Sequence, residues 1–229
     1  MSNVLVVDYP VDNGLPMEAA LALDARGART DSPDSVIVSL ALTVEARDPA
    51  TADHCQRLSR YATALGRKIG LGDEEIATLD RGGYLHDIGK IGIPGAVLQK
   101  RGPLSLRERT LVEQHTVIGD RLCGALRSLR RVRPIVRHHH ERMDGTGYPD
   151  RLRGDAIPLL ARIVGVVDVF DALMAERPYK PALSFERAAE ILREEAARGW
   201  RCADLVDAFL DLMERDGVIP PRLTPHRCR

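Results

Sequence analysis

The stretch HHERMDGTGYP, residues 139–149, is the most informative part of this chain of 229 residues. Two adjacent histidines are followed within a few residues by an Asp-Gly pair and a Gly-Tyr-Pro turn. Glycine permits backbone angles that other residues avoid, and proline fixes one angle, so the chain must turn sharply here. Imidazole nitrogens beside such a turn indicate a ligand-bearing site and not a hydrophobic core.

The composition around this stretch favours one mainly helical domain. Aromatic residues make up 4% of the chain, whereas Ala, Leu, Arg and Glu are abundant. A chain of this length can bury one substantial core but is short for two full domains. We therefore expect an all-α fold, with an N-terminal extension over residues 1–34, a helical domain over residues 35–216 and an irregular tail over residues 217–229. The run VLVVD at residues 4–8 is like the first strand of a receiver domain, but about 100 residues that would complete one are absent.

Charge and cysteine content argue against several classes of protein. Lys plus Arg total 33 and Asp plus Glu total 33, so a net charge of zero gives no reason to expect a nucleic-acid polymer or a membrane surface as partner. The four cysteines lack the paired spacing of a disulfide framework or a zinc knuckle. No apolar run reaches the roughly 18 to 20 residues of a membrane span, and no signal-peptide pattern is visible, so we expect a cytoplasmic protein.

Apolar residues recur at helical spacing along most of the chain. Ser105 and Glu108 have the spacing of a capping box, at the start of a helix that would carry His115 and run to Leu126. Residues 89–95, rich in Gly and Pro, are expected to form a loop. A short helix should precede His139, and the remaining helices are expected over residues 35–45, 55–69, 73–85, 158–175, 184–198 and 203–215. The first of these would cover the core, with homodimerisation as the alternative.

Five of the seven histidines fall at chemically interesting positions: His54, His86, His115, His139 and His140. His86 is followed by Asp87 where a helix ends. His54 and His115 lie next to or within apolar helix faces, so both should point inward. A core histidine bonded to the backbone would explain either one alone, but together they favour a metal site. His138 is left out, because neighbouring helical residues project about 100° apart and three in a row cannot easily converge.

Two aspartates lie on the apolar helix expected over residues 158–175. Asp168 interrupts the run IVGVVDVF, where an unpaired carboxylate would be costly to bury, so a metal or another cation must offset it. Asp171 is expected to accept a hydrogen bond that orients a ligand histidine. Imidazole nitrogens combined with carboxylates suit iron, manganese or zinc better than magnesium, which prefers oxygen ligands.

These segments together resemble the HD-GYP family of bacterial cyclic di-GMP phosphodiesterases. The matching pieces, in chain order, are His54, YLHDIGKIGIP (residues 84–94), EQH (residues 113–115), the stretch at residues 139–149, and DVFDAL (residues 168–173). The match runs from about Val44 to Leu183 and includes both motifs that name the family. The resemblance implies an HD-type helical bundle with additional C-terminal helices.

The resemblance also implies a metal centre with seven protein ligands: His54, His86, Asp87, His115, His139, His140 and Asp168. Asp87 would bridge two divalent ions, iron or manganese, with zinc as an alternative. Some members hold a third metal through a glutamate four residues before the first ligand histidine, but Ala50 stands there, so we expect two metals; Glu45 is a nearby substitute or a solvated charge. Two adjacent cations supply a bridging hydroxide that would open cyclic di-GMP to pGpG, and either pGpG or GMP would be the final product.

Further roles carried over from the family concern the substrate. Asp87 and Lys90 are expected in catalysis, and Lys90, Arg177 and Lys180 would contact its phosphates or guanine, although a surface salt bridge would explain each cation alone. Tyr148 would line the substrate pocket, contact a diguanylate cyclase domain through the Gly-Tyr-Pro loop, or merely pack the turn. The alternative functions are hydrolysis of another cyclic dinucleotide, or a non-catalytic cyclic di-GMP sensor or interaction module.

Overall fold

The structure is a computed structural model that describes residues 43–44, 54–176 and 181–215. These residues form helices and connecting turns, with no strand among them, as the expected all-α fold requires. The elements are α2 (His54–Lys68), α3 (Asp73–Leu85), η1 (Ile88–Gly92), α4 (Gly95–Leu98), α5 (Leu106–Glu113), α6 (His115–Gly124), η2 (Arg127–Leu129), α7 (Arg133–His138), η3 (Gly154–Ala156), α8 (Leu159–Met174), α9 (Phe185–Ala197) and α10 (Ala203–Arg215). The expected extension and tail lie outside the described residues, and the domain limits stay predictions.

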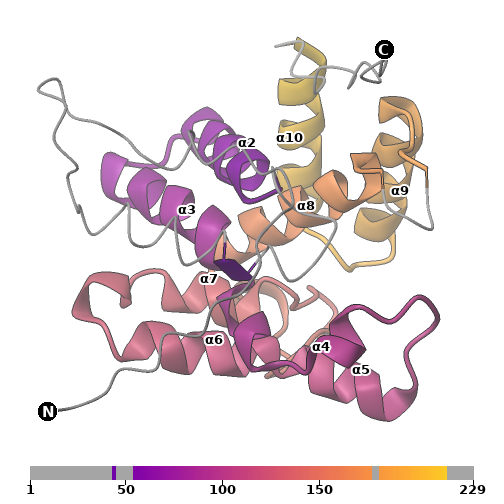
Figure 1. Cartoon of the computed structure of the whole chain (residues 1–229). Helices are drawn as coiled ribbons and strands as arrows, with labels where there is room; N and C mark the ends of the chain where they lie inside the picture. Colours follow the sequence, from indigo (N-terminus) through magenta and orange to yellow (C-terminus); the bar gives the residue numbers. More distant parts are fainter. Residues whose placement is uncertain (1–42, 45–53, 177–180, 216–229) are drawn as a thin grey trace, which may run out of the picture.

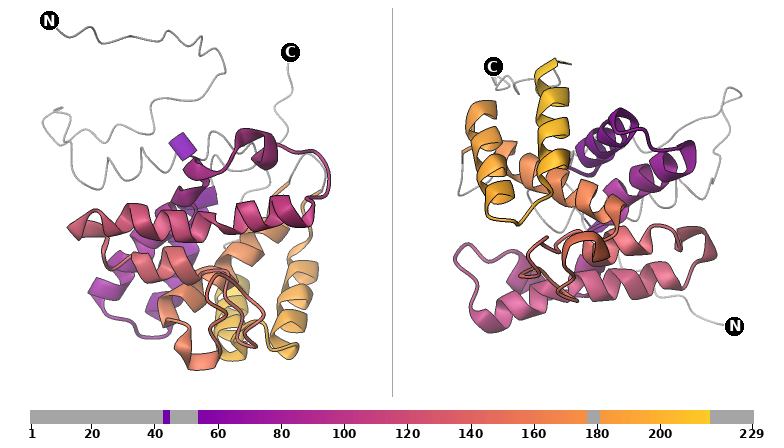
Figure 2. Two further views of the ribbon diagram at one scale, coloured as in Figure 1. Left: turned by 90° about the horizontal axis from the view of Figure 1, so that it is seen from below. Right: turned by 180° about the vertical axis from the view of Figure 1, so that it is seen from behind.

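Helix α8 runs between two groups of helices. Figure 1 shows α2, α3, α9 and α10 on one side of it and α4, α5 and α6 on the other, and the reverse view in Figure 2 gives the same arrangement. Helix α8 packs against α2, α3, α7, α9 and α10. Because its residues are apolar on most sides, its burial in the middle of the molecule is the expected outcome.

The core consists of two clusters of buried side chains. The larger cluster joins α2, α3, α8, α9 and α10, and at its centre the Phe170 ring meets those of Tyr61 and Phe209 edge to face, with centroids 6.2 and 5.0 Å away. The smaller cluster includes Leu85, Ile88, Cys123 and Val136. Helices α3 and α7 contribute to both clusters, so the ends of these helices lie where the two clusters meet.

Several helix ends follow the rules used to predict them. Helix α3 begins at Asp73 with acidic residues through its first turn, where the helix dipole favours negative charge. At α5 the capping box is confirmed: the Glu108 N–H donates to Ser105 Oγ (3.3 Å), and the Ser105 N–H donates to Glu108 Oε2 (2.8 Å). Ser184 caps α9 in the same way through the Arg187 N–H (3.3 Å). Helices α8 and α10 lie within a residue of their expected bounds.

The predicted single helix over residues 105–126 is wrong, because the chain forms α5 and α6 with a break at Gln114. The Gln114 N–H donates to the Leu111 carbonyl (3.2 Å), only three residues earlier. This is the hydrogen bond of a 3-10 turn, which interrupts the α-helical pattern. The His115 ring stabilises the break by donating from Nδ1 to the Val112 carbonyl (2.7 Å). The break makes His115 the first residue of α6.

Two further expectations about helices can be compared with the structure. The segment expected as a loop over residues 89–95 contains a 3-10 turn, η1, and the start of α4, so that expectation is partly wrong. Thr43 and Val44 are helical, and Val44 is 5% exposed within the smaller cluster, which favours core covering for the segment at residues 35–45; the rest of that segment lies outside the described residues. Among the described helices, none is long and apolar enough to cross a membrane.

Candidate metal centre

Five histidines meet where the two core clusters join, and each comes from the end of a helix. His54 and His115 are the first residues of α2 and α6, His86 follows α3, and His139 and His140 follow α7. The rings form one group, with centroid separations of 5.2 Å for His54–His86, 5.1 Å for His86–His139 and 5.2 Å for His115–His140. All but His140 are at most 5% exposed. The inward orientation expected for His54 and His115 is therefore observed.

Two glycines let the backbones approach closely enough to form this group. A Cβ on Gly89 in η1 would lie 1.8 Å from the His115 carbonyl oxygen, and one on Gly165 in α8 would lie 2.6 Å from the His139 carbonyl oxygen. Any side chain at these positions would push the helices apart, and the histidines with them. Gly89, the first glycine of the IGKIG run, thus has a packing role in the site.

Asp87 lies at the centre of the group. It belongs to two sets of side chains that could each hold a metal ion: Asp87 with His115, His139 and His140, and Asp87 with His54 and His86. Its Oδ1 is 3.2 Å from His115 Nε2 and 3.9 Å from His139 Nε2, while its Oδ2 is 3.2 Å from His86 Nε2. The two carboxylate oxygens thus face different sets, which is the arrangement that a bridging ligand requires.

Hydrogen bonds fix which nitrogen of each ring faces the centre. Three rings donate from Nδ1 to a carbonyl one helical turn earlier: His86 to Gly83 (3.0 Å), His115 to Val112 (2.7 Å) and His139 to Val136 (3.1 Å). Because a carbonyl can only accept, Nδ1 must carry the hydrogen. A neutral ring then presents the lone pair of Nε2 to the centre, as a metal ligand does.

Three buried polar atoms at the centre have no hydrogen-bond partner among the described residues. They are Asp87 Oδ1, His115 Nε2 and His139 Nε2. Leaving such atoms unsatisfied costs about 1 to 3 kcal/mol each. A divalent cation would satisfy them together, because metal–nitrogen bonds of about 2.1 Å place neighbouring donors roughly 3 to 3.5 Å apart. The donor set fits nitrogen- and oxygen-binding metals such as iron, manganese or zinc.

Protonation states support the same conclusion. Burial lowers the pKa of His139 and of His140 well below the usual range, so both rings are neutral near pH 7. Burial would raise the pKa of the Asp87 carboxyl, but the charges of Lys90 and His86 hold it well below the usual range. At His86 the Asp87 charge outweighs burial and raises the pKa to about 9, so without a metal this ring keeps a second proton. A bound cation would displace that proton.

Two aspartates of α8 complete the surroundings of His54. Asp171 Oδ2 accepts from His54 Nδ1 (2.7 Å), and Arg57 Nε donates to Asp171 Oδ1 (2.5 Å). Burial would raise the pKa of Asp171, but the hydrogen bonds from His54 and Arg57 lower it, so the carboxylate is ionised and orients the ring. Asp168 Oδ1 lies 3.5 Å from His54 Nε2, on the side of the ring opposite Asp171, but Asp168 belongs to neither set of donors around Asp87. Its role as a metal ligand stays a prediction.

Comparison with known proteins identifies the family to which this helical arrangement belongs. Residues 39–201 match the family model described as "HD domain". The chain belongs to the HD domain family. This match covers most of the chain and, together with the helical architecture, confirms the expected HD-type bundle.

Relatives of this HD domain bear out the resemblance to the HD-GYP proteins. The chain is 42% identical over 169 residues to the cyclic di-GMP phosphodiesterase response regulator RpfG of Xanthomonas campestris, covering 72% of this chain and 45% of the relative. It is 35% identical over 188 residues to the 3'3'-cGAMP-specific phosphodiesterase 3 of Vibrio cholerae, covering 82% and 40%. The chain therefore spans less than half the length of these relatives. The solved structure of Bd1817, an HDG"Y"P protein from Bdellovibrio bacteriovorus, shares the fold with a TM-score of 0.59 at 22% identity, covering 79% of this chain and 62% of that one.

The residues expected to contact substrate are partly described in this HD domain. Lys90 Nζ lies 2.7 Å from Asp87 Oδ2, so its ammonium group reaches the centre. The Tyr148 ring lies over His140, with centroids 4.9 Å apart and planes tilted by 33°. Burial, and next the charges of Asp87 and Glu113, raise the pKa of the Tyr148 hydroxyl, which stays protonated. Arg177 and Lys180, also expected to bind substrate, lie outside the described residues.

Glu141, which the sequence did not single out, organises the loop after the histidines. It is 4% exposed, and its Oε1 accepts the Asp150 backbone N–H (2.8 Å), which closes the loop over residues 141–150. Its place directly after two histidines was the available signal. His138, omitted from the ligand set, belongs to neither set around Asp87 and lies near Glu141 and Asp150 instead. Arg137 already bonds both oxygens of Asp150 (2.6 and 2.8 Å), which disfavours a cation there.

Proposed function

We propose that this HD domain is a metal-dependent phosphodiesterase that opens cyclic di-GMP to linear pGpG, with either pGpG or GMP as the final product. The observation that carries the proposal is the shared carboxylate of Asp87, with its two oxygens facing two sets of imidazole rings. The names of relatives at 42% and 35% identity, both phosphodiesterases of cyclic dinucleotides, support the reaction class.

Two divalent ions, iron or manganese with zinc as an alternative, are proposed to occupy the centre. One would be held by His115, His139 and His140, the other by His54, His86 and Asp168, and Asp87 would bind both. When bound, such a pair lowers the pKa of a coordinated water and neutralises charge on phosphate oxygens. A third ion is not expected; Ala50 and Glu45, on which that expectation rests, lie outside the described residues.

The protein's own side chains would position the substrate. Lys90 now pairs with Asp87, and cations that neutralise Asp87 would leave the Lys90 ammonium free to bind a phosphate oxygen. The Tyr148 ring, lying over His140, offers a flat apolar surface to a base or ribose. Arg177 and Lys180 are proposed to add positive charge near the phosphates or a base. All four residues would bind the substrate without taking part in metal binding.

The choice of substrate and partners is a further part of the proposal. Relatives are named for cyclic di-GMP and for 3'3'-cGAMP, so hydrolysis of another cyclic dinucleotide is the second candidate. A sensor without activity is disfavoured, because the complete set of donors would have no use in it. Contact of the Gly147-Tyr148-Pro149 loop with a diguanylate cyclase domain, and homodimerisation, stay predictions.

Replacement of the shared carboxylate tests the function. Purified Asp87→Ala protein should bind neither metal and should show no hydrolysis of cyclic di-GMP, measured by elemental analysis and product chromatography after anaerobic preparation. Asp155→Ala, in which the replaced side chain is 97% exposed, is the matched control and should retain both. Turnover by the Asp87 variant, or tight binding of cyclic di-GMP by the metal-loaded wild type without any product, would contradict the proposal.

A further inference from the structure

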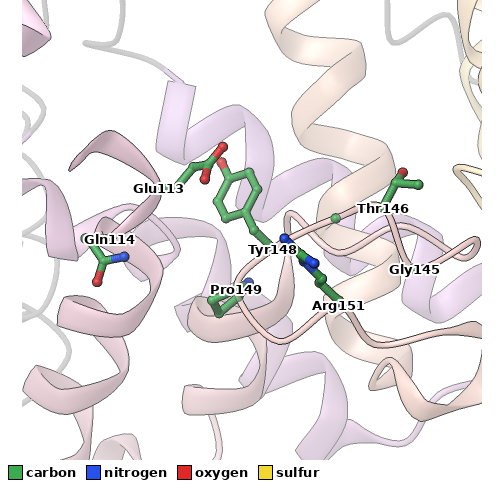
Figure 3. A pocket seen from close by; sticks show the side chains of 8 residues that line it. Glu113, Gln114, Gly145, Thr146, Tyr148, Pro149 and Arg151 are labelled. Atoms are coloured by element: carbon green, nitrogen blue, oxygen red, sulfur yellow. The ribbon is translucent and has the colours of Figure 1, made fainter. Parts of the chain in front are cut away.

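A cavity of about 490 Å³ lies beside the metal centre, between the α5–α6 junction and the loop over residues 145–151. Figure 3 shows the Tyr148 ring between Glu113, at the end of α5, and Arg151, in the loop. The same ring lies 4.9 Å from His140 and 6.3 Å from His115, centroid to centroid. Tyr148 is therefore a wall shared by the cavity and the centre, and a ligand of the centre can extend into the cavity.

Arg151 lines this cavity and is exposed. Within the described ranges, no acceptor or acidic group is paired with its side chain. Its backbone φ is 56°, in the left-handed region that costs a non-glycine residue about 1 to 2 kcal/mol. The buried Glu141 carboxylate, which accepts the N–H of the preceding residue, holds the turn in place. Strain that is kept by such a contact is typical of functional loops.

Glu113 contributes the opposite charge. Its side chain is 32% exposed, and Oε1 lies 3.4 Å from Nε of Arg109, which is itself 70% exposed. An exposed pair at this distance is weak, so the carboxylate can accept stronger hydrogen bonds from a ligand. The cavity thus offers acceptors at Glu113, donors at Arg151 and an aromatic face at Tyr148.

This combination matches the edges of guanine. Guanine presents donors at N1 and N2, which a carboxylate can accept, and acceptors at O6 and N7, which a guanidinium binds with two parallel hydrogen bonds. Adenine presents an unprotonated N1 in place of N1–H and an amino group in place of O6. Its N1 lone pair would face the Glu113 carboxylate, and its amino group would face the Arg151 donors. Such mismatches in a partly buried site reduce binding strongly.

We propose that this cavity binds one guanine base of the substrate, with Glu113 accepting from N1–H and N2–H and Arg151 donating to O6 and N7 against the Tyr148 ring. The proposal rests on the function proposed above, because the cavity adjoins the centre that would cleave the dinucleotide. It makes Glu113 and Arg151 specificity-determining residues. Neither belongs to the metal centre, so base preference and cleavage can be separated.

The pairing is tested by removing a hydrogen-bonding group from the protein, by substitution, or from the ligand, by use of an analogue. The kcat/KM of wild type, Glu113→Gln and Arg151→Gln is measured with cyclic di-GMP and with cyclic di-IMP, which lacks the 2-amino group. Wild type should prefer cyclic di-GMP by about 10-fold or more, since a hydrogen bond to a charged group is lost with the inosine analogue. Glu113→Gln should lower kcat/KM for cyclic di-GMP by at least about 10-fold and nearly abolish that preference. Arg151→Gln should lower kcat/KM for both substrates, because both carry O6 and N7.

Controls separate base reading from folding. Bis(p-nitrophenyl) phosphate has no base, so all variants should hydrolyse it at the wild-type rate, and Arg107→Gln, on the exposed part of α5, should behave as wild type with every substrate. Equal losses with all substrates would show a structural role and overturn the proposal. Unchanged preference in the Glu113 variant would overturn it while the phosphodiesterase function stands. A wild type inactive on every cyclic dinucleotide would overturn both.

Discussion

His86, His115 and His139 are at most 1% exposed, and a carbonyl one turn earlier holds each ring. On the rim of the neighbouring cavity, Glu113 is half-buried and weakly paired, and Arg151 is exposed, with no side-chain partner in the described part of the chain. The centre is organised before any ligand arrives. The rim of the cavity keeps hydrogen-bonding capacity for a ligand. If the domain cleaves a cyclic dinucleotide as proposed, cleavage should depend on the interior and substrate choice on the rim, so substitutions should affect one without the other.

The largest expected effect comes from breaking the interior at Gly89. A Cβ there would lie 1.8 Å from the His115 carbonyl oxygen, so Gly89→Ala must separate η1 from α6. We expect a loss of about 3 kcal/mol or more in the free energy of unfolding, together with loss of metal binding, measured by urea denaturation and elemental analysis. Gly102→Ala is the control, because its added Cβ would meet nothing within 4 Å. Equal stability of the two variants would contradict this account.

A smaller effect is expected when the hydrogen bond that orients His54 is weakened. Asp171→Asn removes the charge that orients His54 and leaves Arg57 without its carboxylate. The affinity of one of the two metal sites should fall about 10- to 100-fold while the other is retained, as metal titration monitored by calorimetry would measure. Asp211→Asn, a change on the surface, should bind both metals normally. Simultaneous loss of both metals in the Asp171 variant would mean that the sites are not separable.

At Arg151, on the rim of the cavity, substitutions should reveal backbone strain without changing the metal centre. Because its φ of 56° suits glycine, Arg151→Gly should be about 1 kcal/mol more stable than Arg151→Ala in urea denaturation. The order should reverse at Arg109 within α5, where glycine weakens a helix relative to alanine by a similar amount. Both Arg151 variants should bind metal as wild type does. A more stable alanine variant would show that the turn is unstrained.

The smallest effect concerns the capping box of α5, which carries Glu113. The Lys100 ammonium and then the Ser105 N–H bond to Glu108 and lower the pKa of its carboxyl to about 2, from an unfolded value of 4.5. A lowered pKa means that this stabilisation is fully present above about pH 4.5 and is lost as the pH falls through about 2. Glu108→Gln should therefore lower the melting temperature by about 1 to 3 °C at pH 7, and by less with each step below pH 4.5. A difference in melting temperature between Glu108→Gln and the wild type that grows below pH 4.5 would refute this account.

The interior could be anticipated from the sequence because its groups are rare and their spacing is informative. His54 and His115 were placed inward from the apolar residues around them, and Asp171 was expected to orient a histidine, which it does at 2.7 Å. The break at Gln114 was not predicted, because the apolar spacing continues across it and only the local hydrogen bonds change. That break also determines that Glu113 and His115 belong to different helices.

The rim could not be predicted in the same way. Glu113 and Arg151 are 38 positions apart, and nothing periodic links a helix end to a loop residue. Their common cavity depends on how the loop over residues 141–150 closes, which rests on the hydrogen bond between Glu141 and the Asp150 backbone. Contacts of this kind follow from tertiary placement. The roles of Arg177 and Lys180 stay predictions, since both residues lie outside the described part of the chain.

The position of the centre between the two core clusters has a consequence for the life of the protein in a cell. If the donors bind metals as proposed, the ions tie α2 and α8 to α6 and α7, and so hold both halves of the core together. Ligand binding to the folded state lowers the fraction that opens and becomes accessible to proteases. Metal supply would then govern how much of the protein accumulates, as well as whether it is active. Pulse-chase measurements of its half-life in metal-depleted and metal-replete cells would reveal this dependence.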